Sequence, residues 1–511
     1  MQAQVAVAGG GPVGMLVAAE LAGYGVDVVV FETRADVSER PKATTLHARA
    51  VQCLARRGHL PPGAADGPGG AAAGDFHFAG LPGLAIAVPP TEPVAILKTS
   101  QAQLERHFEA RARAAGARVL RGHRVTGIEQ DREGVRLKVE GPDGTTVCEA
   151  RYLVGADGAR STVREQAGIA SDTSPATVSA LTGLVTLEEP EALPGGFLRT
   201  PRGWIVSKYQ PGRGTSIRTL DCRAPAGDRH LPVSPEEFRL EVSRIAGRDV
   251  AMGQPRWLGR FSDYTRLART FREGRVFLVG DAAHVHFPIG GQGLSAGVLD
   301  ALCLGWKLAL AVRGEAGPAL LDSYDPERRT AARRVVENTR AQLTLMRPGP
   351  EVDALRSVFA GVVAADRGLL GNMISAQDTV LPGYTQRPSP GEGTFLANMP
   401  LTTPEGVTDV IGLLRDGRPL LLLLGDGASR HRAAVRPWEP AVRVVEPARP
   451  ETGPAYDAVL VRPDGYVAWS SSSSSSSGGG GGLGAALSRY FGAGRGTGPG
   501  TGSSGRAPWI S

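Results

Sequence analysis

The stretch VAVAGGGPVGMLVAAELAGYGVDVVVFE, residues 5–32, decides the fold predicted for this chain. Residues 4–8, a glutamine followed by an apolar run, are typical of a short buried strand, and residues 12–24 have the apolar spacing of a helix. A second apolar run over residues 26–31 completes a strand, helix and strand. The stretch therefore predicts a parallel βαβ unit of the Rossmann type.

Three glycines join the first strand to the helix. Gly9, Gly11 and Gly14 have the GxGxxG spacing, which permits a tight turn and a close approach of the backbone to a pyrophosphate at the helix N-terminus. Glu32 ends the second strand about 20 residues further on, where its carboxylate can accept hydrogen bonds from a ribose. GxGxxG alone is a weak signal, but the whole unit predicts a dinucleotide site that NAD, NADP and FAD would all fit.

A second glycine-rich turn favours FAD among these three. In RVFLVGDAAHVHFPIGGQGLSAG, residues 275–297, an apolar strand leads to Asp281, and the Gly290–Gly293 turn opens a helix. A flavin needs both features, because its ribityl chain carries hydroxyls and its pyrimidine edge becomes anionic on reduction. The positive end of a helix dipole stabilises such an edge, so we expect the turn to hold the isoalloxazine ring.

Composition indicates a globular protein. The 511 residues are 41% hydrophobic and 21% charged, enough for about two to four domains. The net charge of +6 comes from arginines scattered among acidic residues, which argues against nucleic-acid binding. Four cysteines without a CxxC pair predict neither a metal site nor a disulfide framework and favour a cytoplasmic location. No signal peptide is predicted, because the N-terminus lacks a basic segment followed by an apolar one. The longest leucine run, residues 420–424, is far too short for a membrane span and predicts a buried strand.

The pattern along the chain predicts an α/β protein with a FAD-binding, Rossmann-like domain in two parts. Residues 1–176 form its first part, and residues 258–395 form its second part with long helices. Residues 177–257 are rich in strands and Gly/Pro turns, which predicts an inserted, mostly antiparallel, substrate-binding sheet.

The remainder, residues 396–511, is expected to form a small C-terminal α/β domain. Its segment AVLVRPDGYVAW, residues 458–469, has the pattern of a hairpin around a Pro-Asp-Gly turn. A Ser/Gly tract, residues 470–482, is predicted to be a disordered loop, because such a composition cannot pack a core.

A third motif, YLVGADGARSTVR at residues 152–164, makes a family resemblance specific. The GxGxxG at residues 9–14, the Asp157–Gly158 pair and the Gly280–Asp281 pair, in this order and spacing, resemble the single-component FAD-dependent aromatic hydroxylases over roughly the whole chain. The C-terminal part resembles the thioredoxin-like domain of actinobacterial hydroxylases that act on aromatic polyketides such as angucyclines and anthracyclines.

The resemblance implies FAD contacts at further positions. Arg49 and Gln101 match residues that contact the pyrophosphate and ribityl region, and Val125 matches a backbone contact to adenine. Asp157 matches an aspartate implicated in FAD and NADPH interactions, and Asp281 matches the ribityl contact. The expected cofactor-binding set is Gly9, Gly11, Pro12, Val13, Gly14, Glu32, Thr33, Arg34, Arg49, Gln101, Val125, Asp157, Asp281, Pro288, Gly291, Gly293, Leu294 and Ser295. No catalytic side chain is assigned.

The sequence departs from the family pattern at two positions. Ser295 stands where relatives commonly carry Asn, and Leu299 where they carry Gln, so contacts to the flavin edge are expected from backbone N–H groups instead. Several residues also have simpler interpretations. Asp157 can cap the turn after its strand, Arg49 can be a solvated charge on a helix face, and His284 fits a hydrogen-bonded structural role.

The resemblance implies a monooxygenase for antibiotic biosynthesis. NADPH would reduce FAD as a transient co-substrate, since no second strand–GxGxxG–helix unit is predicted for the nicotinamide, and a flavin C4a-hydroperoxide would hydroxylate a large polycyclic aromatic polyketide. Two alternatives remain: Baeyer–Villiger insertion or oxidative rearrangement on a polyketide ketone, and a non-catalytic protein that binds flavin or polyketide. The expected partner is a small molecule rather than nucleic acid or membrane, and a homodimer is left open.

Overall fold

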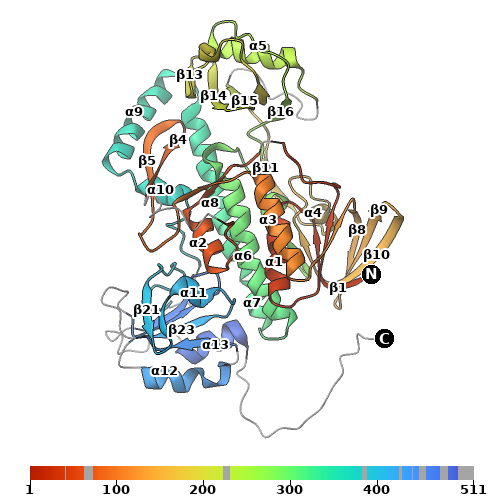
Figure 1. Cartoon of the computed structure of the whole chain (residues 1–511), viewed down its shortest axis with the longest axis vertical. Coiled ribbons are helices and arrows are strands. Elements are labelled where there is room, and N and C mark those ends of the chain that lie inside the picture. Colours follow the sequence, from red (N-terminus) through yellow and green to blue (C-terminus); the bar gives the residue numbers. More distant parts are fainter. Residues whose placement is uncertain are drawn as a thin grey trace.

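The structure, a computed structural model, describes residues 1–40, 42–62, 73–222, 231–382, 388–424, 428–439, 441–447, 456–471 and 482–492. The chain forms an elongated molecule with a central body, a sheet-containing lobe at one end and a C-terminal lobe at the other (Figure 1). The long helix α6 runs through the body between the two lobes.

The body is built on an eight-stranded sheet. The path β18-β19-β10-β1-β2-β7 includes the parallel pairs β1 with β2, β1 with β10, β10 with β19, and β2 with β7, and β9 and β8 extend it from β10. The strands are β1 (Gln2–Ala8), β2 (Val28–Glu32), β7 (Arg118–Arg121), β8 (Arg124–Gln130), β9 (Val135–Gly141), β10 (Gly144–Gly155), β18 (Arg272–Glu273) and β19 (Val276–Leu278). The predicted βαβ unit and its Rossmann-like parallel sheet are confirmed.

Helices and short strand pairs surround this sheet. The helices of the body are α1 (Pro12–Gly23), α2 (Ala48–Arg56), α3 (Gln101–Ala114), α4 (Thr162–Gln166), α6 (Gln292–Val312), α7 (Pro318–Asp322), α8 (Tyr324–Met346), α9 (Pro350–Ala365) and α10 (Leu369–Ile374). The short strands are β3 (Thr45–His47), β4 (Ala73–Phe78), β5 (Leu81–Ala87), β6 (Ile96–Lys98), β11 (Ser171–Ser174), β17 (Thr265–Ala268) and β20 (His284–Val285). Helix α1 packs against both α3 and α6.

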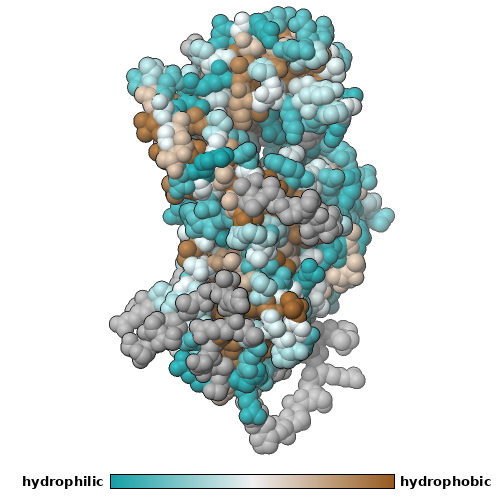
Figure 2. All heavy atoms as spheres, turned by 60° about the vertical axis from the view of Figure 1, so that its left-hand side comes forward, coloured by the Kyte–Doolittle hydropathy of each residue, from teal (hydrophilic) through white to brown (hydrophobic). Residues whose placement is uncertain are grey.

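The segment Ile289–Val312 is long and apolar enough to cross a membrane, but its most apolar 18-residue stretch is fully buried inside the protein. It is therefore a core helix, and its apolar composition reflects contacts with other elements of the body. The face drawn in Figure 2 mixes hydrophilic and hydrophobic residues, and those whose placement is described form no continuous hydrophobic band there.

The sheet-containing lobe is antiparallel, with strand order β13-β14-β15-β12-β16. Its elements are β12 (Ala180–Val185), β13 (Gly196–Thr200), β14 (Gly203–Gln210), β15 (Gly214–Asp221), α5 (Pro235–Ala246) and β16 (Trp257–Phe261). One face packs against α5, where Ile205, Ile217 and Phe238 share a buried cluster. Trp204 and Leu220 lie on the other face, in an apolar cluster with residues of the body. The three boundaries between the four segments given above stay predictions.

The C-terminal lobe contains a four-stranded sheet of order β24-β23-β25-β26. Its elements are β21 (Pro400–Thr403), β22 (Gly406–Asp409), α11 (Val410–Leu414), β23 (Leu420–Leu423), α12 (Ala428–Val435), β24 (Arg443–Val445), β25 (Ala458–Val461), β26 (Val467–Ser471) and α13 (Leu483–Phe491). The predicted buried strand and hairpin are confirmed. Ser470 and Ser471 belong to β26 rather than to a loop, and residues 472–481 of the predicted disordered tract lie outside the described residues.

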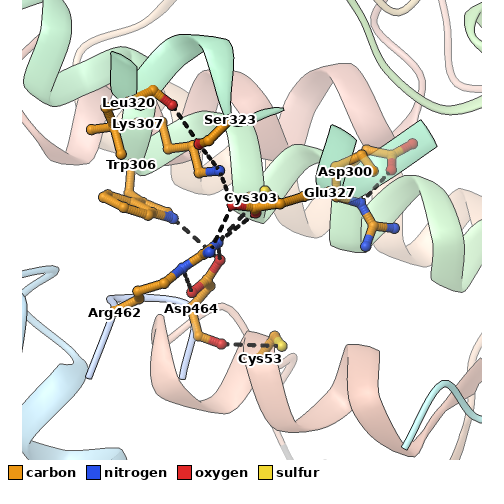
Figure 3. Close-up of polar contacts among 11 residues, drawn as sticks. Cys53, Asp300, Cys303, Trp306, Lys307, Leu320, Ser323, Glu327, Arg462 and Asp464 are labelled. Carbon is orange, nitrogen blue, oxygen red and sulfur yellow. Dashed lines mark hydrogen bonds and ion pairs between the residues drawn. The ribbon is translucent and has the colours of Figure 1, made fainter. Parts of the chain in front are cut away.

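Four buried charges join this hairpin to the body (Figure 3). Lys307 on α6 lies 2.8 Å from a Glu327 oxygen on α8, and Arg462 pairs with both Glu327 at 2.9 Å and Asp464 at 2.6 Å. Burial alone would raise the pKa of Glu327, but Arg462 and Lys307 lower it to about 2. Two cations and two carboxylates thus neutralise each other, which is what makes their burial tolerable.

We expect Glu327→Gln to lower the free energy of unfolding by about 3–5 kcal/mol at pH 7, because removal of one partner leaves buried charge uncompensated. Chemical denaturation measures this difference. Glu337→Gln is the matched control, since Glu337 lies on the same helix but is exposed, and we expect no measurable loss from it.

The same loss should depend on pH. The folded-state pKa of Glu327, about 2, lies below the ordinary value of 4.5, so its contribution is present above 4.5 and disappears as the pH falls toward 2. The stability gap between the wild type and Glu327→Gln should therefore narrow on acidification below about pH 5. Equal stabilities at pH 7, or a gap that widens in acid, would contradict this account of the network.

Candidate active site

The first glycine turn can exist only with glycine at two of its positions. Gly9 has φ +102°, and a Cβ there would lie 2.3 Å from the carbonyl oxygen of Ala156. A Cβ at Gly14 would lie 2.0 Å from the carbonyl oxygen of Gly9. Gly11 differs, because its φ is −66° and no atom of the described residues lies within 4 Å of a Cβ built on it. The protein itself therefore does not require glycine at Gly11, but a ligand that approaches the backbone there would.

The beginning of α1 is suited to an anion. Gly11 is its N-cap, no side chain caps it, and its first turn contains no acidic residue. The first backbone N–H groups of a helix have no partner within the helix, and together with the helix dipole they attract a phosphate. This end of α1 fits the pyrophosphate of a dinucleotide.

The second glycine turn has a similar construction. Gly290 and Gly291 are both left-handed, with φ +74° and +63°, and Gly291 is the N-cap of α6 with no side-chain cap. His47 holds the turn from outside, because its Nε2 lies 2.8 Å from the Gly290 carbonyl oxygen. Ser295 does not face only the turn, since its hydroxyl accepts the backbone N–H of His47 at 3.0 Å.

Close packing at α6 brings the two turns together. A Cβ at Gly297 would lie 2.7 Å from a methyl carbon of Val13 in the first turn of α1 and 3.4 Å from the Cα of Gly280. Gly280 itself lies against Val13. The beginning of α1, the turn that carries Asp281 and the beginning of α6 are thus parts of one site. The Asp281 side chain is exposed, so it is accessible to a bound dinucleotide.

A buried carboxylate fixes the geometry of the second motif. Asp300 on α6 accepts hydrogen bonds from the Gly280 backbone N–H at 3.0 Å and from Arg328 at 2.8 Å, and it lies 2.7 Å from His284 Nε2. Burial acts to raise the pKa of Asp300, but Arg328 and His284 hold it below the ordinary value. His284 thus has a structural role, as interpreted from the sequence. Asp300 was missed there, although an acid inside the apolar run AGVLDALCLGW is the signal that could have found it.

Glu32, Arg34 and Val125 meet at one edge of the sheet. The Glu32 carboxylate accepts the backbone N–H groups of Gly10 at 2.6 Å and Arg34 at 2.9 Å, and its backbone carbonyl accepts that of His123 just before β8. Val125 is buried near the start of β8. An ionised carboxylate has lone pairs for more than two donors, so Glu32 keeps acceptor capacity for a ribose.

Asp157 performs its capping role and retains an unused oxygen. Its Oδ2 accepts the backbone N–H of Val163 at 3.1 Å, in α4, while its buried Oδ1 has no partner among the described residues. Burial raises the pKa of Asp157, and hydrogen bonds from Ser161 and Val163 oppose that effect. The residue lies beside the first turn, because a Cβ at Gly9 would be 2.8 Å from the Asp157 nitrogen.

Arg49 is not a solvated charge, which corrects the simpler interpretation. It is buried, its guanidinium donates to the Gln377 carbonyl at 2.9 Å, and it lies 3.7 Å above the Phe395 ring. These contacts lead toward the C-terminal lobe rather than to either glycine turn. Gln101 lies at the start of α3, where its backbone N–H donates to Ala43. The FAD contacts expected of Arg49 and Gln101 stay predictions.

Lys42 lies near the expected cofactor site, whereas Leu299 faces away from it. Lys42, which the sequence did not single out, lies close enough to Asp281 to interact with it. Partial desolvation and Arg34 lower the pKa of Lys42, and Asp281 acts to raise it. Leu299 lines a small buried cavity with Cys53 and Tyr466, so it faces the C-terminal hairpin. A lone lysine in an irregular segment carries no sequence pattern by which its place could be predicted.

The comparisons with known proteins define the class. Residues 2–339 match the family described as FAD binding domain, and residues 389–494 match aromatic-ring hydroxylase, C-terminal. The chain belongs to the FAD-binding aromatic-ring hydroxylases, and it is a FAD-dependent aromatic monooxygenase of that family.

Several relatives extend over nearly the full length. The chain is 36% identical over 491 residues to the 12-dehydrotetracycline 5-monooxygenase/anhydrotetracycline 6-monooxygenase of Streptomyces rimosus, covering 92% of this chain and 96% of the relative. It is 38% identical over 505 residues to the dialkyldecalin synthase of Streptomyces rugosporus, covering 96% and 99%. The crystal structure of CabE, an aromatic hydroxylase from angucycline biosynthesis, has a TM-score of 0.87 and 34% identity, covering 97% and 100%.

We expect Gly11→Val to fold normally but to lose FAD, because the backbone angle and the open space accept a side chain that then blocks the pyrophosphate. FAD content per purified chain and thermal melting measure the two effects. Gly23→Val is the control, since Gly23 lies at the other end of α1 and also has nothing within 4 Å of a built Cβ. A full complement of FAD in Gly11→Val would remove the pyrophosphate from this turn.

Asp281→Ala should weaken FAD binding by about 1.5–3 kcal/mol, or roughly 10- to 150-fold in Kd, through loss of a charged acceptor. Titration of the apoprotein with FAD, followed by flavin fluorescence, gives the Kd. Asp143→Ala removes an equally exposed aspartate from the β9–β10 turn and should leave the Kd unchanged. If both variants bind FAD as the wild type does, Asp281 does not contact the cofactor.

Proposed function

We propose that the chain uses NADPH and dioxygen to hydroxylate a large, polycyclic aromatic polyketide during antibiotic biosynthesis. The family supports the monooxygenase class, and the names of the tetracycline monooxygenase and of the angucycline hydroxylase support a fused-ring substrate. No second GxGxxG directly follows a predicted strand in the sequence, which supports a transient encounter with NADPH rather than a permanent site.

The contact between Phe287 and Phe261 carries this proposal. Phe287 directly precedes Pro288 at the second glycine turn, and its ring centroid lies 5.9 Å from that of Phe261 in β16. Both belong to an apolar cluster shared by β4, β5, α8, α9, α10 and the five-stranded sheet. The second turn thus opens onto aromatic and aliphatic side chains, which suit an apolar fused-ring substrate and exclude water.

The residues present fit FAD from end to end. The free N–H groups at the start of α1 would hold the pyrophosphate, Glu32 a ribose, and Val125 the adenine side. Asp281 would accept ribityl hydroxyls, and the backbone N–H groups of residues 293–295 would face the pyrimidine edge. When bound, FAD supplies electron transfer from the nicotinamide and the activation of dioxygen.

His47 stabilises the turn as a neutral side chain. Burial lowers the pKa of His47 to about 4, against a smaller opposite effect of its bond to Gly290, so it is uncharged at neutral pH. Its Nε2–H then donates to the Gly290 carbonyl, which holds the left-handed turn in place. A charged imidazole at this point would place a positive charge beside the positive end of the α6 dipole.

The C-terminal lobe we propose to be a thioredoxin-like domain with a packing role. A parallel pair, β23 with β24, and the antiparallel strands β25 and β26 support that comparison. All four cysteines are free, and none lies in this lobe, so thiol–disulfide exchange is not part of the proposal.

One experiment tests the proposed reaction. The FAD-loaded enzyme is incubated with NADPH, ¹⁸O₂ and tetracyclic phenols such as anhydrotetracycline, and the products are analysed by mass. We expect one ¹⁸O atom on an aromatic ring and NADPH oxidation that rises with substrate. Gly11→Val is the control for flavin dependence.

Three results would contradict hydroxylation. Insertion of ¹⁸O beside a ketone would indicate Baeyer–Villiger chemistry, and no turnover with tight substrate binding would indicate a binding protein. A product that is an isomer of its substrate would indicate ring formation. The 38% identity to a dialkyldecalin synthase makes this alternative worth measuring.

A further inference from the structure

The five-stranded sheet has one face that points away from α5, which we call the open face. Alternate residues of each strand belong to it, because Ile205 and Ile217 pack on the α5 side and their neighbours point the other way. Five residues of the open face join the apolar cluster of the body: Ala180, Phe197, Trp204, Leu220 and Phe261.

Arg218 is the next residue of β15 on this open face. It lies two residues, or about 7 Å, along the strand from Leu220, and it pairs in register with Thr182 on one side and Val206 on the other. Its side chain is exposed and has no hydrogen bond or ion pair among the described residues.

The other two arginines in these strands are paired. Arg199 pairs with Asp353 of α9, and Arg260 pairs with Glu237 of α5 at 2.7 Å. Arg218 therefore differs from both: it is the arginine that the sheet carries toward the body without an acid to balance it. Partial desolvation of the guanidinium by the surrounding side chains lowers the pKa of Arg218.

The residues next to Arg218 on the open face have small side chains, and an aromatic ring lies beyond them. Thr182 separates Arg218 from Gly259, which has no side chain. The indole of Trp257 lies over Gly259, since its Cζ2 is 2.8 Å from the position of a built Cβ, and Thr182 Cγ2 is 3.6 Å from the same point. A flat ligand can thus contact the indole and reach the guanidinium without displacing a large side chain.

The charges near Arg218 have the same sign. Lys208 lies on the open face of β14, diagonally opposite Arg218, and it is close enough to Lys98 of β6 to act on it. Burial lowers the pKa of Lys98, and Lys208 lowers it further. The positions of β12–β16 on the open face contain no aspartate or glutamate. No acidic residue of these strand positions therefore balances Arg218 and Lys208, and an anionic ligand can do so.

We propose that Arg218 is a specificity-determining residue that binds an anionic oxygen group of the aromatic substrate, while Trp257 contacts its ring system. The inference rests on the proposed function, because it places the substrate on the open face. A guanidinium binds a carboxylate or an ionised enol through short, charge-assisted hydrogen bonds. The substrate class is thus narrowed to fused-ring aromatic acids.

Two matched probes test this with the FAD-loaded enzyme. Anthraquinone-2-carboxylate and anthraquinone-2-carboxamide have the same rings and differ in charge, and equilibrium dialysis gives their Kd values without turnover. The wild type should prefer the carboxylate, and Arg218→Gln should weaken carboxylate binding by about ten-fold or more. Carboxamide binding should change by less than about two-fold. Arg213→Gln, which removes an exposed arginine from the β14–β15 turn, should bind both probes as the wild type does.

Two results would overturn the assignment. One is a wild type without preference for the carboxylate, including one that binds neither probe, and the other is an Arg218→Gln variant that loses both probes alike. Because dialysis needs neither NADPH nor dioxygen, the outcome is separate from that of the labelling experiment. An enzyme that shows the preference but inserts no oxygen would overturn the proposed function and support the role of Arg218.

Discussion

The site depends on a close contact between α1 and α6 near their N-terminal ends. Gly297 lets α6 approach Val13 at the start of α1, and Gly280 fits into the same small space. A methyl group at Gly297 would lie 2.7 Å from Val13, so either helix would have to move. Because the phosphate end of the cofactor is expected at α1 and its ring at α6, that movement would alter the length of the site itself. Close packing thus sets the distance between the two ends of the ligand.

Buried charges hold these elements in register. Asp300 holds the Gly280 backbone from inside α6, and Arg328 of α8 neutralises it. On the same two helices, Lys307 pairs with Glu327, and Glu327 binds the hairpin residue Arg462, which also pairs with Asp464. One helix pair therefore connects the cofactor turn to the C-terminal lobe. Such networks are costly to break and contribute more to a single defined arrangement than to net stability.

Local features of the fold could be predicted from the sequence, and features that depend on distant contacts could not. The βαβ unit and the 458–469 hairpin are written in short-range periodicity and turn residues, and both are confirmed. The burial of Arg49 could not be predicted because its partners, Gln377 and Phe395, are over 300 residues away in the chain. The role of Asp300 in an apolar helix could not be predicted because its hydrogen-bond partners come from other elements. The position of Arg218 on the open face could not be predicted either, because it depends on the pairing of β15 with β12 and β14.

The central claim is that both glycine turns bind a single FAD, and a crystal structure of the complex with FAD tests it most directly. The account predicts pyrophosphate oxygens within hydrogen-bond distance of the backbone N–H groups at the start of α1. It also predicts the pyrimidine edge of the isoalloxazine against the backbone of residues 293–295, with Asp281 on the ribityl chain. A complex in which the flavin ring lies away from the Gly290–Gly293 turn, or in which Asp281 contacts no part of FAD, would contradict it.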